Sequence, residues 1–462
     1  MNKFLYGASV QGIQEFIFKT NKLQEIVGAS EIVKNISRLF EDNFKADKII
    51  INIAGNIKVI FNNKEECEKA VLNFPKMVMK KAYGITISQA VIKFDDGELK
   101  EAFQKLEKNL FIQRNKASIL PDMSINIIKL APKTARPVVE GDKDRATIQK
   151  EEANISQGNI PKNKKNKTAV IHVDGNGLGA MIASMLKELQ TDKEVIKAYK
   201  EFSDNLDKAT TEAYKVAKKD IKDKDIKEII LGGDDVSVIC NADVALDFTN
   251  IFLEEFETQT KKLLGKDGLS ACAGVAYCNH KYPFHYAINL AESLCGYAKE
   301  HSKKIDKNLA PSSLMFHNIQ SSNFESFKEY QDKELILKND KEIIHLTYGP
   351  YFIQEQTNYS TIKAFLNLSE AFKLKGSPIS RLREWLTILG QNSAEAKERL
   401  LRINDMMDLR DDIFKKQSLE NSFRVFNINI KLDELTFDRD EEKYTPMGDI
   451  INYLSVINWS KK

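Results

Sequence analysis

The stretch EIILGGDDVSVIC (residues 228–240) places two glycines and two aspartates between two apolar runs. Apolar, β-branched runs on either side of a glycine pair predict a β-hairpin that turns at Gly232-Gly233. A turn requires only one or two residues that tolerate positive φ. It does not explain why Asp234 and Asp235 stand side by side, where their charges repel each other. The aspartate pair therefore indicates a function beyond that of the turn.

Length and composition limit the classes of protein to consider. A chain of 462 residues is expected to form two to four domains. Its 69 Lys and Arg nearly balance its 66 Asp and Glu, so the net charge does not by itself indicate nucleic-acid binding. We find no apolar run long enough to cross a bilayer and no signal-peptide pattern. The five cysteines form no C-x-x-C pair and are expected to be reduced and buried. We expect a soluble, cytoplasmic protein without a membrane partner.

The surroundings of the hairpin occur twice along the chain, each time in the order β-α-β-β-α-β. In the first copy the strands and the second helix are FLYGAS (4–9), KIIINIAGNIKVIF (48–61), a helix over 64–84 and ITISQAVIKF (85–94). In the second copy they are TAVIHVDGNGLGAMIASML (168–186), the 228–240 hairpin, a helix over 242–264 and GLSACAGVAYC (268–278). A long helical insert over 193–220 interrupts the second copy. This order predicts two ferredoxin-like sheets, each with helices on one face.

The two copies differ in their chemistry. Ser9 stands where the second copy has Asp174, and Asn56-Ile57 stand where it has Asp234-Asp235. In the turns, Gly12 falls opposite Gly177. One copy thus holds acidic side chains in both places and the other holds none, which indicates one active and one degenerate unit.

The chain divides into four parts. The degenerate unit spans 1–130, a polar linker rich in Lys and Asn spans 131–167, and the acidic unit spans 168–318. The remainder, 319–462, shows apolar residues at helical spacing and is expected to form a mainly helical domain. The predicted fold class is α+β.

Carboxylates from two separate strands are expected to converge in the second unit. In the ferredoxin-like order the first strand lies next to the central hairpin, so Asp174 approaches Asp234 and Asp235 across about sixty residues of sequence. Clustered carboxylates repel unless a cation lies among them, and hard oxygen ligands favour Mg²⁺ or Mn²⁺. Such ions bind phosphate oxygens and assist displacement at phosphorus. The pattern predicts a metal site for phosphoryl transfer.

The residues after Asp174 agree with phosphate chemistry. The run Gly175, Asn176, Gly177, Leu178 and Gly179 precedes a predicted helix. Glycine backbone can approach a polyanion closely, and a helix N-terminus offers free N–H groups to a triphosphate.

Two other loop types fit less well. A calcium loop starting at Asp174 would need an acid at its twelfth position, where this chain has Met185. A dinucleotide-binding turn has the spacing G-x-G-x-x-G, whereas this loop has G-x-G-x-G after an aspartate.

These motifs together resemble a known family. LGGDDVSVIC, VIHVDGNGLG and LSACAGVAYCNHKYPFHYAINLAESLCGYAKEHSKK resemble the palm domain of the polymerase-cyclase large subunit of type III CRISPR effector complexes. SVQGIQEFIFKTNKLQEIVGASEIV looks like the first, degenerate palm of that family. The resemblance covers most of 1–318 and, more loosely, the helical end. It implies two palms and the joining of ATP into cyclic oligoadenylate messengers in antiviral defence, with other effector subunits and guide or target RNA as partners.

The resemblance also implies roles for single residues. It makes Asp174 and Asp234 metal ligands, with Asp235 beside them as a further ligand or electrostatic partner. It places the base and ribose against the hairpin glycines, Gly232 and Gly233. It places the triphosphate against Lys299, near the end of the last palm helix.

Departures from the family leave alternatives open. The chain opens on the first palm, contains no His-Asp dipeptide and lacks a cysteine cluster between the palms, so no HD-type nuclease and no zinc site are expected. The leading interpretation is an ATP- and Mg²⁺-dependent nucleotidyltransferase or cyclase. The alternatives are a structural palm subunit of an RNA-guided complex, a nucleotide sensor without turnover, and a cyclic-dinucleotide synthase of another anti-phage system.

Overall fold

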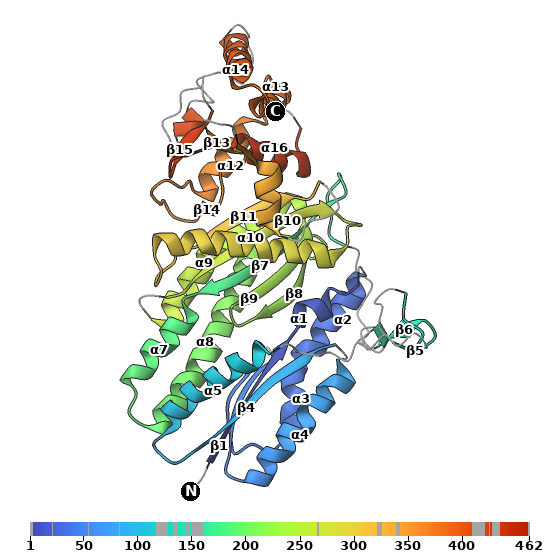
Figure 1. Cartoon of the computed structure of the whole chain (residues 1–462), viewed down its shortest axis with the longest axis vertical. Coiled ribbons are helices and arrows are strands. Elements are labelled where there is room, and N and C mark those ends of the chain that lie inside the picture. The colour runs from blue at the N-terminus through green and yellow to red at the C-terminus, as the bar shows by residue number, and fades with distance from the viewer. Residues whose placement is uncertain are drawn as a thin grey trace.

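The computed structural model describes residues 3–20, 22–53, 55–82, 84–116, 128–132, 137–144, 147–148, 151, 160–265, 268–320, 326–338, 342–408, 421–424, 426 and 435–460. Across these ranges, no helix combines the length and the apolar character that a membrane crossing requires. Figure 1 shows two stacked palm-like sheets with their helices, followed by the C-terminal elements at one end.

The first unit, called palm 1 below, is a four-stranded antiparallel sheet in the order β2-β3-β1-β4. Its strands are β1 (Lys3–Gln11), β2 (Lys48–Ile53), β3 (Asn56–Phe61) and β4 (Thr86–Phe94). Its helices are α1 (Ile13–Ile17), α2 (Leu23–Lys34), α3 (Ile36–Asn43), α4 (Lys64–Lys81) and α5 (Leu99–Arg114). The side chain of Asn63 caps α4 by accepting a hydrogen bond from the Glu65 N–H, which satisfies one of the free donors at that end.

The second unit, palm 2, is a six-stranded sheet in the order β14-β11-β10-β7-β9-β8. Its strands are β7 (Lys167–Asn176), β8 (Ile226–Gly232), β9 (Asp235–Asn241), β10 (Ser270–Asn279), β11 (Ser313–Asn318) and β14 (Tyr351–Phe352). The run β8-β9-β7-β10 repeats the strand order of palm 1. The predicted pair of ferredoxin-like sheets is therefore confirmed. Palm 2 is extended by two strands, the second of which comes from the chain beyond residue 318.

The helices of palm 2 follow the predicted pattern. They are α7 (Leu178–Glu188), α8 (Asp192–Lys218), the 3₁₀ turn η1 (Ala242–Val244), α9 (Ala245–Leu264) and α10 (Phe284–Ile305). The long helix predicted over 193–220 is α8. A capping box of Thr191 and Glu194 starts it, and its buried residues recur at helical spacing.

The turn of the GGDD hairpin lies one residue later than the sequence suggested, whereas the predicted turn at Gly55-Asn56 in palm 1 lies one residue earlier. Gly232 pairs with Asp235 at the end of the ladder, so the turn is Gly233-Asp234 and not Gly232-Gly233. In palm 1, Ser9 pairs with Asn56, as Asp174 pairs with Asp235 in palm 2. Asn56 is therefore the counterpart of Asp235, and the residue before it is the counterpart of Asp234. The alignment of Asn56-Ile57 with the aspartate pair was wrong by one position, because sequence alone did not fix the strand register.

The two palms share a packed interface. The ring of Phe103 on α5 stacks on Tyr199 of α8, with ring centroids 4.4 Å apart. Asp192, the first residue of α8, accepts hydrogen bonds from the N–H groups of Gly97 and Leu99 at 2.9 and 3.2 Å. A helix of palm 2 thus caps and covers α5 of palm 1, and this contact holds the two sheets at a fixed relation.

Further interface contacts lie beside the GGDD strand. On α2, Ser30 donates a hydrogen bond to the carbonyl of Ile229, and Lys34 Nζ lies 2.9 Å from Glu228 Oε1.

The remaining elements combine the predicted helices with a sheet that was not predicted. The helices are α11 (Phe327–Tyr330), the π-helical turn η2 (Gln331–Leu335), α12 (Ile362–Ala371), α13 (Ile379–Leu389), α14 (Ser393–Asp408) and α16 (Met447–Val456). The sheet has the order β12-β13-β16-β15 and consists of β12 (Ile336–Lys338), β13 (Ile343–His345), β15 (Phe437–Arg439) and β16 (Glu442–Tyr444). Strands of three residues are too short to show an alternating pattern. In the predicted linker, β5 (Val138–Glu140) and β6 (Lys143–Asp144) form a small hairpin.

Candidate functional site

The three predicted acidic residues meet at one edge of the palm 2 sheet. Asp174 lies near the end of β7 and pairs in register with Asp235, the first residue of β9. Asp234 occupies the turn before β9, and its carbonyl accepts a hydrogen bond from the Gly175 N–H at 3.2 Å. Residues about sixty positions apart in sequence are thus held together by the ladder itself, as the strand order predicts.

Glycine at position 175 is required by this packing. A Cβ atom at that position would lie 2.7 Å from the Cβ of Asp234, closer than real Cβ contacts allow. The absence of a side chain at Gly175 therefore lets the hairpin turn close over the end of β7.

Lys299 approaches the cluster from α10. Its Nζ lies 2.7 Å from Asp174 Oδ2 and 2.7 Å from the Gly175 carbonyl oxygen. The helix can lie this close because Gly274 faces it from β10, where any Cβ would clash with the backbone of Ala291. Lys299 thus forms an ion pair with Asp174, one of the three carboxylates of the cluster. The resemblance had implied that Lys299 faces the triphosphate.

The environment of the other two carboxylates disfavours their negative charge. Burial raises the pKa of Asp234 above its ordinary value, and the charge of Asp174 adds to the rise. Burial raises the pKa of Asp235 to about 7, and the charges of its acidic neighbours act in the same direction. The Asp235 side chain keeps 43% of its exposure, yet its Oδ1 atom is enclosed and has no hydrogen-bond partner among the described residues. This environment therefore favours a proton or a further cation beside Asp234 and Asp235.

Two residues that the sequence argument missed lie close to Asp235. His172 Nδ1 lies 3.5 Å from Asp235 Oδ1, and burial lowers the pKa of this imidazole to about 4, so it stays neutral near pH 7. Glu292 on α10 has its pKa raised to about 7 by burial, and its charge contributes to the raised pKa of Asp235. The available signals were spacings: His172 precedes Asp174 by two strand positions, and Glu292 precedes Lys299 by two helical turns.

Two side chains of α8 form hydrogen bonds with the turn of the hairpin. Gly233 has φ +60°, a conformation that favours glycine. The Gly233 carbonyl accepts a hydrogen bond from the Thr210 hydroxyl, and its N–H points to Asp207 Oδ1 at 3.5 Å. Gly232 is the last, buried residue of β8. The turn that carries Asp234 therefore has a defined position.

The run after Asp174 divides between two sides of α7. Gly177, with φ +79°, is the N-cap of this helix, and Leu178 faces the hairpin side. The Asn176 side chain is turned away from the carboxylates and donates hydrogen bonds to β10. Gly179 is exposed, and a Cβ there would meet nothing within 4 Å. Of these predicted nucleotide-binding residues, the structure brings the backbone of Gly175 and the side chain of Leu178 to the site.

A cavity of about 470 Å³ opens between the hairpin and palm 1. Palm 2 contributes Gly232 to Asp235 together with residues of α7 and α8. Palm 1 contributes residues of α1, α2 and α3 and of the equivalent hairpin; its polar side chains are Ser30, Lys34, Ser37, Asn52, Asn56 and Lys58. This volume falls within the range of small-molecule sites, roughly 300–1,000 Å³. The two hairpins of the repeat thus face one cavity.

A divalent cation fits the donor set of this site. Within the part of the chain that the structure describes, no three acidic, His or Cys side chains form a preassembled metal cluster. Mg²⁺ commonly takes only one or two carboxylates and completes its shell with water and substrate phosphates. The enclosed Oδ1 of Asp235 and the raised pKa values of Asp234 and Asp235 provide oxygen ligands that a cation would stabilise.

Comparison with known proteins finds a family model that matches the segment carrying this site. Residues 167–308 match the family model described as Cas10/Cmr2, second palm domain. A search of curated proteins gave no match.

Several solved structures share the fold. The structure described as a Csm1–Csm4 cassette in complex with pppApA matches with TM-score 0.56 and 11% identity, over 99% of this chain and 70% of that chain. The Csm1–Csm4 subcomplex of the type III-A CRISPR-Csm interference complex matches with TM-score 0.53 and 12% identity over the same shares. In a cassette bound to cA4, the match spans about half, 53%, of that chain. The segment that carries Asp174, the GGDD hairpin and Lys299 is thus similar to the second palm domain of Cas10/Cmr2.

Proposed function

We propose that this protein joins ATP molecules by Mg²⁺- or Mn²⁺-dependent phosphoryl transfer at the GGDD hairpin, and releases a cyclic oligonucleotide of the cyclic oligoadenylate type. One observation carries the proposal: Asp234 and Asp235, which the strand ladder holds beside Asp174, line a cavity whose opposite wall is the second copy of the same hairpin. Such a cavity can hold a donor and an acceptor nucleotide face to face, which replaces much of the entropic barrier to joining them.

The residues of the chain have separate roles in this proposal. Asp174, Asp234 and Asp235 hold the metal, which would polarise the phosphate oxygens and lower the pKa of the attacking hydroxyl. Lys299 would leave Asp174 and contact the triphosphate once a metal is bound, because the metal and the Lys299 ammonium compete for the Asp174 carboxylate. Leu178 and the backbone of Gly232 and Gly233 form the surface against which base and ribose lie.

The proposal extends to the cellular setting. We propose a cytoplasmic protein of antiviral defence that assembles with a Csm4-like subunit and with guide and target RNA. The basis is that the solved structures of the same fold are described as Csm1–Csm4 cassettes, several of them with adenine nucleotides bound.

The test is the conversion of labelled ATP by the purified protein with Mn²⁺ or Mg²⁺, with products resolved by chromatography. We expect oligoadenylate products from the wild type and none from Asp234→Ala. Asp223→Ala is the matched control, because Asp223 is 91% exposed in the loop before β8 and pairs only with Lys218 among the described residues. ATP that binds without being converted would leave a nucleotide sensor, and absence of binding would leave a structural palm subunit.

A further inference from the structure

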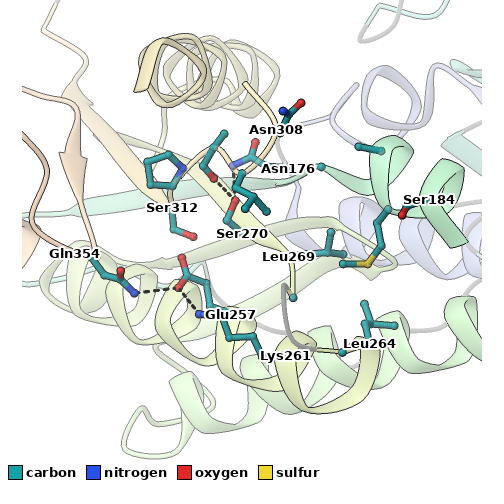
Figure 2. A pocket seen from close by; sticks show the side chains of 18 of the residues that line it. Asn176, Ser184, Glu257, Lys261, Leu264, Leu269, Ser270, Asn308, Ser312 and Gln354 are labelled. Carbon is teal, nitrogen blue, oxygen red and sulfur yellow. Dashed lines mark hydrogen bonds and ion pairs between the residues drawn. The ribbon is translucent and has the colours of Figure 1, made fainter. Parts of the chain in front are cut away.

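A second cavity, of about 640 Å³, lies beside α7 (Figure 2) and shares no lining residue with the inter-palm cavity. Its wall comes from α7, the end of α9, the first residues of β10 and the segment that leads into β11. The α7 residues Ala180, Met181, Ser184 and Met185 line it, whereas Leu178 and Ile182 line the inter-palm cavity. These sets follow two different faces of one helix. The second cavity is therefore a separate space of ligand size.

Two charged side chains of opposite sign, Glu257 and Lys261, line this cavity, and the hydrogen-bonding capacity of Glu257 is only partly used. The Glu257 side chain is only 14% exposed, and its Oε2 receives the Gln354 amide at 3.4 Å and lies 3.9 Å from Lys261 Nζ. Figure 2 shows Glu257 and Lys261 together on α9, with Ser184 of α7 across the cavity. Both contacts are long for their kind, so the Glu257 carboxylate retains the capacity to accept a further hydrogen bond. One carboxylate and one ammonium leave the lining without net charge.

A hydrogen-bonded polar wall faces this carboxylate. Asn176 is 3% exposed, and its Nδ2 donates to Ser270 Oγ at 3.1 Å and to Cys272 Sγ at 3.2 Å. Ser270 in turn donates to the carbonyl of Ala310. The Asn176 Oδ1 atom has no hydrogen-bond partner among the described residues. The wall is thus held in place by its own hydrogen bonds, with one acceptor left over.

Part of the remaining lining is apolar. Met181 and Met185 contribute flexible thioethers, and Leu264 and Leu269 add aliphatic surface. Thioethers adapt to planar rings and make favourable contacts with them. A polyanion would meet the Glu257 carboxylate with a single ammonium, that of Lys261, to compensate its charge, whereas an uncharged ring with amino and hydroxyl groups can contact both the polar and the apolar parts of the lining.

We propose that this cavity binds a purine nucleoside. Its ring lies on Met181 and Met185, its exocyclic amino group donates to Glu257, and its ribose hydroxyls meet Gln354 and Ser312. The ligand would contact Asn176 and Gly177, which continue β7 directly from Asp174, and so would restrain the turn beside the GGDD site. This site is distinct from the proposed joining site, because it contains neither the aspartates nor Lys299.

The experiment is equilibrium dialysis of the full chain with labelled adenosine and, separately, labelled guanosine. Two tryptophan substitutions on exposed positions of α7 form a matched pair: Ser184→Trp fills the cavity, and Ala183→Trp lies outside the lining of both cavities. We expect at least one nucleoside to bind saturably, with affinity at least tenfold weaker in Ser184→Trp and within twofold of wild type in Ala183→Trp. We also expect Glu257→Gln to weaken binding and unlabelled pyrophosphate not to compete.

A third substitution, Ser203→Trp, fills the inter-palm cavity instead. Nucleoside binding that survives Ser203→Trp and Asp234→Ala supports the second site, whether or not the protein joins ATP. Binding that survives Ser184→Trp and is lost in Ser203→Trp would assign the nucleoside to the inter-palm cavity and overturn the proposal. Absence of saturable binding of either nucleoside, or full competition by pyrophosphate, would overturn it as well.

Discussion

Gly175 and Asp234 in palm 2 occupy the same relative positions as Val10 and Gly55 in palm 1, with the side chains exchanged between strand and turn. The Gly175 and Val10 N–H groups donate to the carbonyls of Asp234 and Gly55, at 3.2 and 3.0 Å. A Cβ on Gly175 would lie 2.7 Å from Asp234 Cβ, and a Cβ on Gly55 would lie 2.7 Å from Val10 Cγ2. Only one of the two positions can carry a side chain. Palm 2 uses the space for a carboxylate and palm 1 for an aliphatic group, which excludes an acidic turn from palm 1.

Gly175→Ala should therefore impair nucleotide joining through Asp234 alone. The new methyl group displaces the Asp234 side chain, so we expect turnover to fall by at least tenfold with a modest loss of thermal stability. Gly179→Ala is the matched control, because a Cβ there meets no atom within 4 Å and alanine favours the helix. Turnover numbers and melting temperatures of both variants check this. Equal turnover in the two variants would show that the position of Asp234 does not limit the reaction.

Asp234→Ala and Asp174→Ala should abolish joining and leave the fold intact. Each removes an oxygen ligand of the proposed metal, and each relieves repulsion within the cluster. In metal-free buffer the melting temperature should therefore fall little or rise. Near-normal turnover in either variant, measured with Mg²⁺ and labelled ATP, would contradict the metal assignment.

Lys299→Ala should raise the KM for ATP more than it lowers kcat. A lysine on the β- and γ-phosphates binds ground state and transition state alike to a large extent, so its loss appears mainly in KM. Lys304→Ala on the same helix is the control, because Lys304 is exposed and pairs with Glu300. Steady-state kinetics over a range of ATP concentrations measure both constants. An unchanged KM would restrict Lys299 to its ion pair with Asp174.

Asp235→Asn should stabilise the metal-free protein at pH 8 and not at pH 4. The pKa of Asp235 is raised from its ordinary value of 3.8 to about 7, so the folded state holds a proton that the unfolded chain releases. Stability is therefore lost as pH rises from about 4 to about 7, and the amide removes that loss. We expect a rise in melting temperature of about 2–4 °C at pH 8. Saturating Mg²⁺ should stabilise the wild type more than the variant. A pH-independent difference would contradict the raised pKa.

The sequence contained enough information for the architecture because the signal was repeated. Two copies of one strand and helix order, each with a glycine-containing turn, predicted two ferredoxin-like sheets, and the structure has both. The register was not available, since a shift of one residue leaves the apolar pattern of a short hairpin almost unchanged. For that reason the turn was predicted at Gly232-Gly233, although it is formed by Gly233 and Asp234.

The candidate site was predictable only where its residues are adjacent in sequence or fixed by strand order. Asp174, Asp234 and Asp235 satisfy this condition. The direction of the Asn176 side chain depends on Ser270 and Cys272, which belong to another strand. The sheet β12-β13-β16-β15 joins segments about a hundred residues apart through strands of three residues, and no local pattern encodes such a pairing.

Palm 1 lines the inter-palm cavity opposite the GGDD hairpin. Asn56 is the counterpart of Asp235, and its Oδ1 is enclosed without a hydrogen-bond partner among the described residues. Together with Lys34 and Lys58 it gives palm 1 polar groups for an acceptor nucleotide but no acidic ligand for a metal. One chain should then be sufficient, and specific activity should stay constant on dilution.

A bulky side chain on the palm 1 side of the inter-palm cavity should prevent the acceptor nucleotide from binding and leave the binding of the donor nucleotide intact. Gly55 is a poor place for it, because its φ of +75° and its contact with Val10 would add strain. Ser37 on α3 lines the cavity, whereas Arg38 on the same helix is exposed and lies outside its lining. We expect Ser37→Trp to lose product while still binding one ATP per chain, and Arg38→Trp to behave as wild type. If specific activity collapses on dilution and Ser37→Trp remains active, the acceptor site must be built by a second chain instead of by palm 1.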